Sequence, residues 1–240
     1  MAVDILKVFI GYDHRQPISY NVLQHSIISQ SSKPVAIIPL VLDQLDMKRT
    51  GLTPFTFSRF LVPYLCDYKG WALFLDLDMV VKDDIAKLFD CADDRYAVMV
   101  AKNEKRFEWA SAMLFNCERN HMLTEQYIRD GAGLHGINWV PESDVGCLPA
   151  DWNVLVGYDE PILNPKLIHY TQGIPLFPET KDCDYANDWF KALERANTAS
   201  SWMELMGSSI HAELLPDGRR VPKYAAKRIR NNEQKDAATA

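Results

Sequence analysis

Two aspartates, Asp76 and Asp78, are separated by one residue and stand directly after the apolar run at residues 71–75. Carboxylates at the mouth of a buried strand repel each other and are costly to remove from water, whereas a divalent cation that bridges them to a diphosphate removes both costs. Oxygen ligands of this kind suit Mg²⁺ or Mn²⁺. The spacing therefore predicts a metal site, while the alternative is that the two aspartates cap a helix or make turns.

The segments around this motif alternate between strand and helix patterns. Apolar runs predict strands at residues 5–10, 35–42, 71–75, 96–101, 110–116 and 167–170. Helical patterns begin at Pro17, cover residues 55–65 and 185–196, and extend from near Glu118 to just before Gly131. Residues 131–165 predict loops and short strands. The alternation predicts an α/β fold with a mostly parallel central sheet flanked by helices, which places the two aspartates at the carboxyl end of a strand.

The composition is that of one folded domain. The chain has 240 residues, of which 48% are apolar, enough for a full hydrophobic core. We expect a domain over residues 1–218 and a charged tail over residues 219–240 that is frayed from Asn231. The formal charge of −6 gives no general attraction to nucleic acid or to an anionic bilayer. The basic stretch at residues 223–230 could still touch a membrane surface, although such a run is more often a solvated helix face.

Cysteine usage and the lengths of the apolar runs favour a location inside the cell. The five cysteines lie far apart without a Cys-x-x-Cys pair, so neither a disulfide framework nor a zinc ribbon is expected. Residues 1–9 lack the basic region and the long apolar stretch of a signal peptide, and no apolar run approaches the roughly 20 residues that span a bilayer. We therefore expect reduced thiols and a cytoplasmic protein.

Four segments carry a resemblance to a known family: residues 8–13 (VFIGYD), 57–63 (FSRFLVP), 74–78 (FLDLD) and 169–173 (HYTQG). In their order and spacing they resemble family 8 of the glycosyltransferases, the group that contains glycogenin and bacterial lipopolysaccharide galactosyltransferases. The 17 residues from Arg59 to Asp76 look like that family's spacing between a donor-contacting arginine and the first metal acid. The resemblance, from about Leu6 to Phe177, implies a single GT-A domain.

The resemblance also implies a metal site and a donor site. Asp76, Asp78 and His169 would bind Mn²⁺, or Mg²⁺, with the imidazole completing the metal shell. Asp13 would accept a hydrogen bond from N3 of uracil, and Arg59 would brace the donor through charge-assisted bonds. The alternative roles are a structural histidine for His169 and a solvated helix charge for Arg59. The implied donor-binding residues are Gly11, Tyr12, Asp13, Arg15, Arg59, Leu77 and Gly173.

Three departures from the family pattern concern the sugar and diphosphate pockets. Trp109 stands where many relatives have Asn, and residues 173–177 contain no lysine, so the usual diphosphate-binding lysine is missing. The usual Asp-Gln pair of the sugar pocket is missing as well. We assign Glu142 and Asp144 as catalytic substitutes for that pair, with solvated loop acids as the equally weighted alternative.

The implied activity is metal-dependent transfer of a hexose from a UDP-sugar, of the UDP-glucose or UDP-galactose type, with retention of configuration. The acceptor could be a glycan, a lipid-linked glycan or a protein. One alternative is a haloacid-dehalogenase-like phosphatase with Asp76 as nucleophile, but that family carries its motif on the first strand, whereas about 70 residues precede it here. A second alternative is a non-catalytic protein that binds nucleotide sugars, because the lysine is missing.

Overall fold

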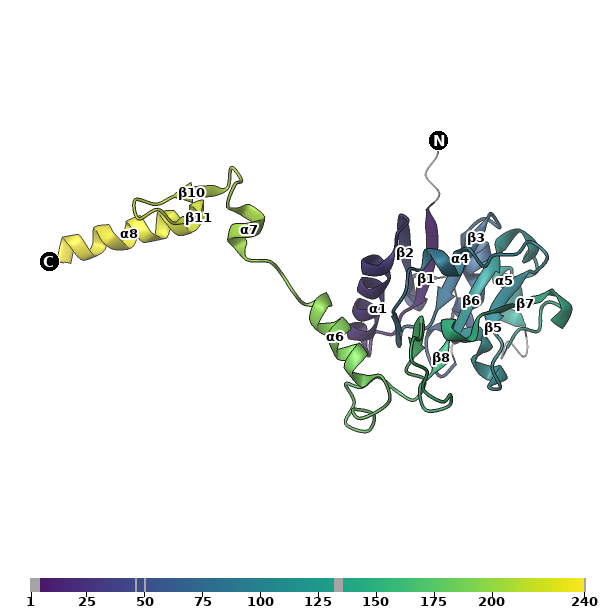
Figure 1. Cartoon of the computed structure of the whole chain (residues 1–240). Helices are drawn as coiled ribbons and strands as arrows, with labels where there is room; N and C mark the ends of the chain where they lie inside the picture. Colours follow the sequence, from purple (N-terminus) through teal and green to yellow (C-terminus); the bar gives the residue numbers. More distant parts are fainter. Residues whose placement is uncertain (1–4, 46, 50, 132–135, 240) are drawn as a thin grey trace. The chain divides into compact units, whose positions relative to one another are not determined.

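The computed structural model describes residues 5–45, 47–49, 51–131 and 136–239. The chain folds as two compact units, Met1–Ala196 and Asn197–Ala240 (Figure 1). The first unit ends with α6 (Ala186–Ala196), and the glycosyltransferase domain expected over residues 1–218 stays a prediction.

A six-stranded central sheet forms the framework of the first unit. Its strands lie in the order β2 (Val35–Leu40), β1 (Leu6–Gly11), β3 (Trp71–Leu75), β6 (Ala112–Asn116), β5 (Val98–Ala101) and β7 (Val145–Leu148). The pairs β1–β2, β1–β3 and β5–β7 are parallel, and β6 is antiparallel to both of its neighbours. The mostly parallel sheet expected from the sequence is confirmed.

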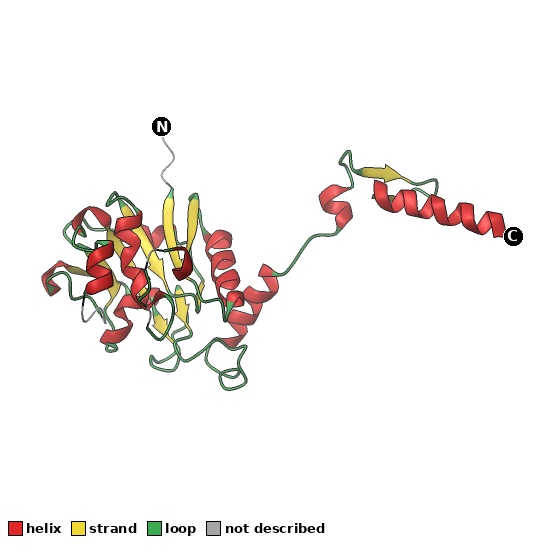
Figure 2. Cartoon of the chain, turned by 180° about the vertical axis from the view of Figure 1, so that it is seen from behind, coloured by secondary structure: helices red, strands yellow, loops and turns green. Residues whose placement is uncertain are grey.

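The inner strands β3, β5 and β6 read as continuous apolar runs because they are covered on both faces. β5 and β6 are buried along their whole length. Helices flank the sheet (Figure 2), and those of the first unit are α1 (Pro17–Gln30), α2 (Phe55–Ser58), α3 (Val62–Leu65), α4 (Ala86–Phe89), α5 (Glu125–Asp130) and α6. The result is a rigid framework whose strand ends can hold a site.

Two helices differ from the sequence-based expectation for local reasons. The helix expected over residues 55–65 is divided into α2, a 3-10 turn (Arg59–Leu61) and α3, because Pro63 has no N–H to continue the α-helical ladder. The start expected for the next helix, near Glu118, is wrong. Cys117–Arg119 form a 3-10 turn, and α5 begins at Glu125 because the side chain of Thr124 caps it there.

A second, three-stranded sheet joins distant parts of the first unit. Its order is β4 (Met79–Val81), β9 (Leu167–His169) and β8 (Val154–Leu155), with β4 antiparallel and β8 parallel to β9. Short 3-10 segments also lie between the strands of the first unit, and they include η1 (Leu42–Gln44), η3 (Arg106–Ser111), η5 (Glu142–Asp144) and η6 (Ala150–Trp152). Over residues 136–165 the loops and short strands expected from the sequence are confirmed.

The second unit contains α7 (Trp202–Met206), an antiparallel pair of β10 (Ala212–Leu214) and β11 (Arg220–Pro222), and α8 (Lys223–Thr239). Ser201 and Glu204 form a capping box at the start of α7. α8 continues to Thr239, and the fraying expected from Asn231 stays a prediction. None of the helices in the described part of the chain combines the length and apolar character that a membrane crossing requires.

Candidate metal centre

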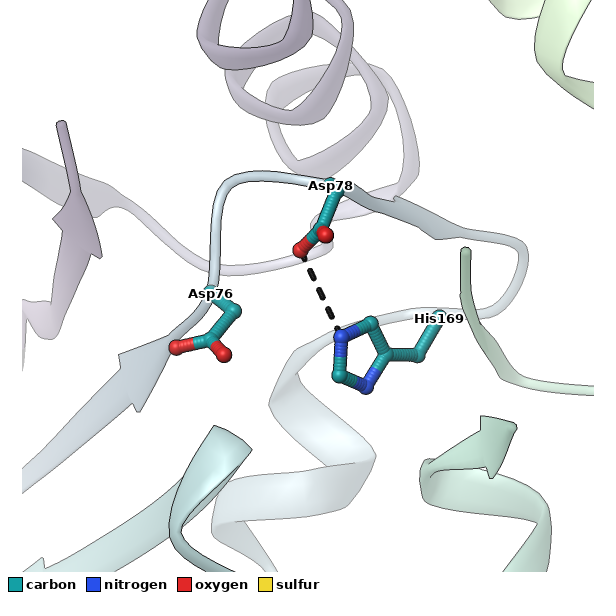
Figure 3. Close-up of side chains that lie close together, drawn as sticks. All are labelled: Asp76, Asp78 and His169. Carbon is teal, nitrogen blue, oxygen red and sulfur yellow. Dashed lines mark ion pairs between the residues drawn. The ribbon is translucent and has the colours of Figure 1, made fainter. Parts of the chain in front are cut away.

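Asp76, Asp78 and His169 meet at the carboxyl end of β3 (Figure 3). Asp76 follows β3, Asp78 stands just before β4, and His169 is the last residue of β9. The pairing of β4 with β9 sets Met79 opposite His169, and the N–H of Tyr170 donates to the carbonyl of Asp78 (2.9 Å). As a result, one possible ligand atom from each of the three residues lies within 4.8 Å of the others.

The side chains of this cluster are largely buried, and several of their polar atoms lack a hydrogen-bond partner. Asp76 is 9% exposed and His169 is 2% exposed. Among the described residues, Oδ1 of Asp76, Oδ1 of Asp78 and Nδ1 of His169 have no hydrogen-bond partner. Nε2 of His169 lies 3.4 Å from Oδ1 of Asp78. Buried polar atoms normally have a hydrogen-bond partner, so carboxylate oxygens that lack one and converge in this way fit a cation.

The charges around the cluster also fit a divalent cation. Burial raises the pKa of Asp76 to about 7 against the opposing effect of Arg59, and Asp78 adds to the rise. Burial lowers the pKa of His169, but Asp78, Asp76 and Glu108 raise it by more, so that this pKa is above its ordinary value. Three carboxylates thus face one guanidinium and one imidazole, an excess of negative charge that a divalent cation would offset.

Arg59 is a buried neighbour of the first aspartate. Its side chain is 11% exposed, and Nη1 lies 3.2 Å from Oδ1 of Asp76. Nη1 also donates to the carbonyl of Ala110 (2.7 Å), and the guanidinium carbon lies 5.5 Å and 5.1 Å from the ring centres of Phe55 and Phe74. The alternative of a solvated helix charge is therefore wrong. Arg59 thus ties Asp76 to the backbone of Ala110.

One acid of the site, Glu108, was missed by the sequence analysis. It lies on η3, and its Oε2 is 3.9 Å from Nδ1 of His169. In the sequence it is distinguished only by standing directly before Trp109, the residue that departs from the family pattern. No local pattern could have found it, because the fold brings η3 to the end of β9 across some 60 residues of chain.

A curated relative and several solved structures resemble this chain. Protein CDI of Arabidopsis thaliana is 36% identical to it over 227 residues, which cover 80% of this chain and 87% of that protein. The chain belongs to the Protein CDI family. No family model matches the chain.

The solved structures show the fold of this CDI-family protein. The bifunctional glycosyltransferase WbbM matches with a TM-score of 0.63 at 21% identity, and GlyE of Streptococcus pneumoniae matches with 0.61 at 16%. The galactosyltransferase LgtC, solved with donor and acceptor sugar analogues, matches with 0.57 at 12%. The matches cover 86%, 85% and 83% of this chain, and 52%, 62% and 99% of WbbM, GlyE and LgtC. The GT-A fold expected from the sequence is confirmed, and the chain spans about half the length of WbbM.

The residues expected to receive the base of the donor lie at the end of β1 in this CDI-family chain. Asp13 has no exposed surface, and it accepts hydrogen bonds from the backbone N–H of Arg15 (3.0 Å) and from its Nε (2.9 Å). These bonds to Arg15 lower the pKa of Asp13 below its usual range. Tyr12 packs edge-on against Tyr20, with ring centres 5.6 Å apart. Asp13 and Arg15 therefore form a prebuilt ion pair beside the strand end.

Gly11 is required by protein packing. A Cβ at Gly11 would come within 2.4 Å of the ring of Phe55, which leaves no room for a side chain. The resemblance implies that Gly11 is a donor-binding residue, which stays a prediction. The neighbour that the structure places against it is Phe55, which also flanks Arg59.

The two remaining donor candidates, Leu77 and Gly173, have different surroundings. Leu77, which stands between the two aspartates in the sequence, is 1% exposed, and its side chain belongs to the core. Gly173 has a φ of +118°, which side chains rarely adopt, and it lines a cavity of about 370 Å³. The described residues that line this cavity include Glu179, Asp182 and Asp184 but no Lys or Arg. A substitute for the missing diphosphate lysine is thus not among them.

Glu142 and Asp144 lie outside the metal cluster. Glu142 pairs with Arg106 (3.0 Å), and Asp144 pairs with Arg119 (3.3 Å). The backbone N–H of Asp76 donates to the carbonyl of Ser111, just before β6. At the other end of β6, the N–H of its last residue, Asn116, donates to the carbonyl of Ala97, and the N–H of Ala97 donates to the carbonyl of Asp144. Asp144 and Asp76 therefore stand at opposite ends of the central sheet. The catalytic role assigned to these two acids stays a prediction, and the acid that lies beside the cluster is Glu108.

Proposed function

We propose that this chain is a metal-dependent glycosyltransferase that transfers a hexose from a UDP-sugar, of the UDP-glucose or UDP-galactose type, with retention of configuration. One observation carries the proposal: Asp76, Asp78 and His169 converge at the carboxyl end of β3 in a GT-A fold. Open α/β sheets bind their ligands at the carboxyl ends of strands. Two carboxylates and an imidazole suit Mn²⁺, or Mg²⁺, beside the phosphates of a donor.

The order of the strands supports a nucleotide that extends from β1 to β3. These strands are parallel neighbours with Ile10 opposite Leu75, so Gly11 stands level with Asp76. The ion pair between the buried Asp13 and the exposed Arg15 follows within a few residues of Gly11. We assign the base of the donor to this pair and its diphosphate to the metal cluster.

The residues of the cluster would hold the cation and keep water away from it. When bound, the cation would neutralise charge that develops on the departing diphosphate. Arg59 keeps Asp76 in place as a ligand, and the burial of Asp76 and His169 strengthens their electrostatic interactions. The side chain of Asp78 is 22% exposed, so the donor would approach the cluster from its side.

A cavity beside η3 supports a place for the acceptor. It has a volume of about 530 Å³, and Arg106, Trp109, Asn138 and Glu142 are among its lining residues. Aromatic rings and paired polar groups are a common lining for sugar-sized ligands. We propose that the acceptor, a glycan, a lipid-linked glycan or a protein, enters here. Loss of transfer in Glu142→Gln or Asp144→Asn, with unchanged Mn²⁺ affinity, would support the catalytic roles predicted for these acids.

The phosphatase alternative is disfavoured by the surroundings of Asp76. A nucleophilic carboxylate must be ionised and accessible, whereas Asp76 is 9% exposed and its pKa is raised to about 7 by burial. The motif also follows β3, the third strand along the chain. A non-catalytic role in nucleotide-sugar binding predicts donor binding without turnover.

The test is a panel of sugar nucleotides with and without Mn²⁺, read by thermal stabilisation and donor hydrolysis. We expect one UDP-sugar to stabilise the wild type and to be slowly hydrolysed by it. Asp90→Ala, a control at an exposed position, should behave like the wild type, whereas Asp78→Ala should show neither effect. Binding without hydrolysis or transfer would favour the non-catalytic role. No response to any sugar nucleotide, together with phosphatase activity that depends on Asp76, would refute the proposal.

A further inference from the structure

His169 turns one ring nitrogen toward the aspartates and the other away from them (Figure 3). Nε2 lies 3.4 Å from Oδ1 of Asp78, on the side of the metal cluster. Nδ1 is buried, lacks a hydrogen-bond partner among the described residues, and has Oε2 of Glu108 at 3.9 Å. A neutral imidazole that offers Nε2 to a cation carries its proton on Nδ1, and a buried N–H without an acceptor is costly.

The geometry of η3 explains why Glu108 faces His169. In a 3-10 helix, residues three apart lie on the same face. Glu108 and Ser111 share the face toward the cluster, where the N–H of Asp76 donates to the carbonyl of Ser111 (2.9 Å). Arg106 and Trp109 share a second face, with the guanidinium carbon 4.9 Å from the ring centre. One short helix thus separates the metal cluster from the cavity proposed for the acceptor.

The backbone that carries Glu108 is held by buried polar groups. Oγ of Ser111 donates to the carbonyl of Glu108 (2.6 Å), and Nδ2 of Asn153 donates to Oγ of Ser111 (3.0 Å). Ser111 and Asn153 are each 1% exposed, and the side chain of Glu108 is 18% exposed. Because its backbone is fixed, a small rotation of the Glu108 side chain is enough to bring Oε2 within hydrogen-bond distance of Nδ1.

We propose that Glu108 is a positioning residue for the metal centre, whose carboxylate accepts a hydrogen bond from the Nδ1–H of His169 and so directs the Nε2 lone pair at the cation. The inference rests on the proposed function, because it requires that the cluster binds a divalent cation. A carboxylate behind a ligating histidine fixes the tautomer and the ring orientation and makes the ligand more basic. Glu108 thereby acts on the metal through His169, without touching the cation.

The test measures Mn²⁺ affinity by electron paramagnetic resonance at about pH 8, so that protonation of the cluster competes little. Glu108→Ala removes the acceptor, whereas Glu108→Gln keeps an oxygen that can accept from Nδ1–H without the charge. Glu104→Ala is the matched control, an exposed acid four residues earlier in the chain. We expect Glu108→Ala to weaken Mn²⁺ binding about 10- to 100-fold, Glu108→Gln to recover most of that loss, and the control to bind like the wild type.

The outcomes separate this inference from the proposed function. A wild-type protein that binds neither Mn²⁺ nor a sugar nucleotide would refute both. Mn²⁺ binding by the wild type that Glu108→Ala retains in full would refute the positioning role alone. Equal losses of Mn²⁺ affinity in Glu108→Ala and Glu108→Gln would also overturn it. They would show that the negative charge of Glu108 is required, as expected for a carboxylate that binds the cation directly. Thermal unfolding without metal checks that each variant is folded.

Discussion

His169 lies directly opposite Met79 in the antiparallel pairing of β9 with β4, one residue after Asp78. This pairing holds the imidazole against the second aspartate, although the two residues are far apart in the sequence. The N–H of Tyr170 donates to the carbonyl of Asp78 and continues the same ladder. Because side chains alternate between the two faces of a strand, a shift of one residue would turn His169 away from the cluster. The metal centre therefore depends on this register.

Asp78→Asn should separate metal binding from folding. The change keeps the shape of the side chain but removes one carboxylate charge, so we expect Mn²⁺ affinity to fall at least about tenfold, or about 1.4 kcal/mol. Stability without metal should be unchanged or slightly higher, because Asp78 raises the pKa of Asp76 through like-charge repulsion. Thermal unfolding with and without MnCl₂ measures both effects. A variant that MnCl₂ stabilises as much as the wild type would contradict the assigned ligand set.

The raised pKa of Asp76, about 7, predicts a pH dependence with a definite sign. The folded protein binds this proton more tightly than the unfolded chain. The contribution of Asp76 to stability without metal should therefore be greatest below about pH 4, and it should be lost as pH rises through about 7. The pKa of His169 is raised as well, which acts in the same direction. Urea unfolding of the metal-free protein at several pH values measures the effect.

Mn²⁺ should replace these protons, so its stabilising effect should be larger at about pH 8 than at about pH 6. Asp76→Asn is the control, because it removes the main titrating group and should flatten the pH dependence. A wild type and an Asp76→Asn variant with the same pH profile would show that Asp76 is not the group responsible.

Arg59→Met should destabilise the fold and weaken the metal site together. It leaves the buried Asp76 without its counter-ion, a kind of change that costs about 3–5 kcal/mol. It should also raise the pKa of Asp76 further, because Arg59 lowers that pKa, and so reduce Mn²⁺ affinity at neutral pH. Urea unfolding and Mn²⁺ titration test the two effects. Arg95→Met, which removes an exposed pair with Asp93, should change neither, and equal behaviour of the two variants would disprove a structural role for Arg59.

Gly11→Ala should act through packing against Phe55. The added Cβ would stand 2.4 Å from the ring, and overpacking of this kind costs about 1–3 kcal/mol. Phe55→Leu in the same protein should restore part of the stability because it makes room for the methyl group. Chemical unfolding of the single and double variants gives the comparison. An alanine variant as stable as the wild type would contradict the packing role of Gly11.

Much of the framework followed from patterns local in the sequence. The strands of the central sheet were found because their apolar runs are buried in place, as at residues 71–75. Asp76 and Asp78 were found because their spacing after such a run is chemically unusual. Local patterns failed where a single residue changed the outcome, since Thr124 starts α5 later than expected and Pro63 interrupts the helix over residues 55–65.

By itself, the sequence determined the α/β alternation, the pair of acids and the identity of His169 as a candidate ligand. Only the tertiary structure decided that Glu108 lies behind His169, that Phe55 explains Gly11, and that Asp144 stands at the far end of the sheet. The physical reason is that strand periodicity and side-chain chemistry act over a few residues. The meeting of η3, β3 and β9 depends instead on how strands pair and on which way short connections turn, and those are settled when the whole core packs.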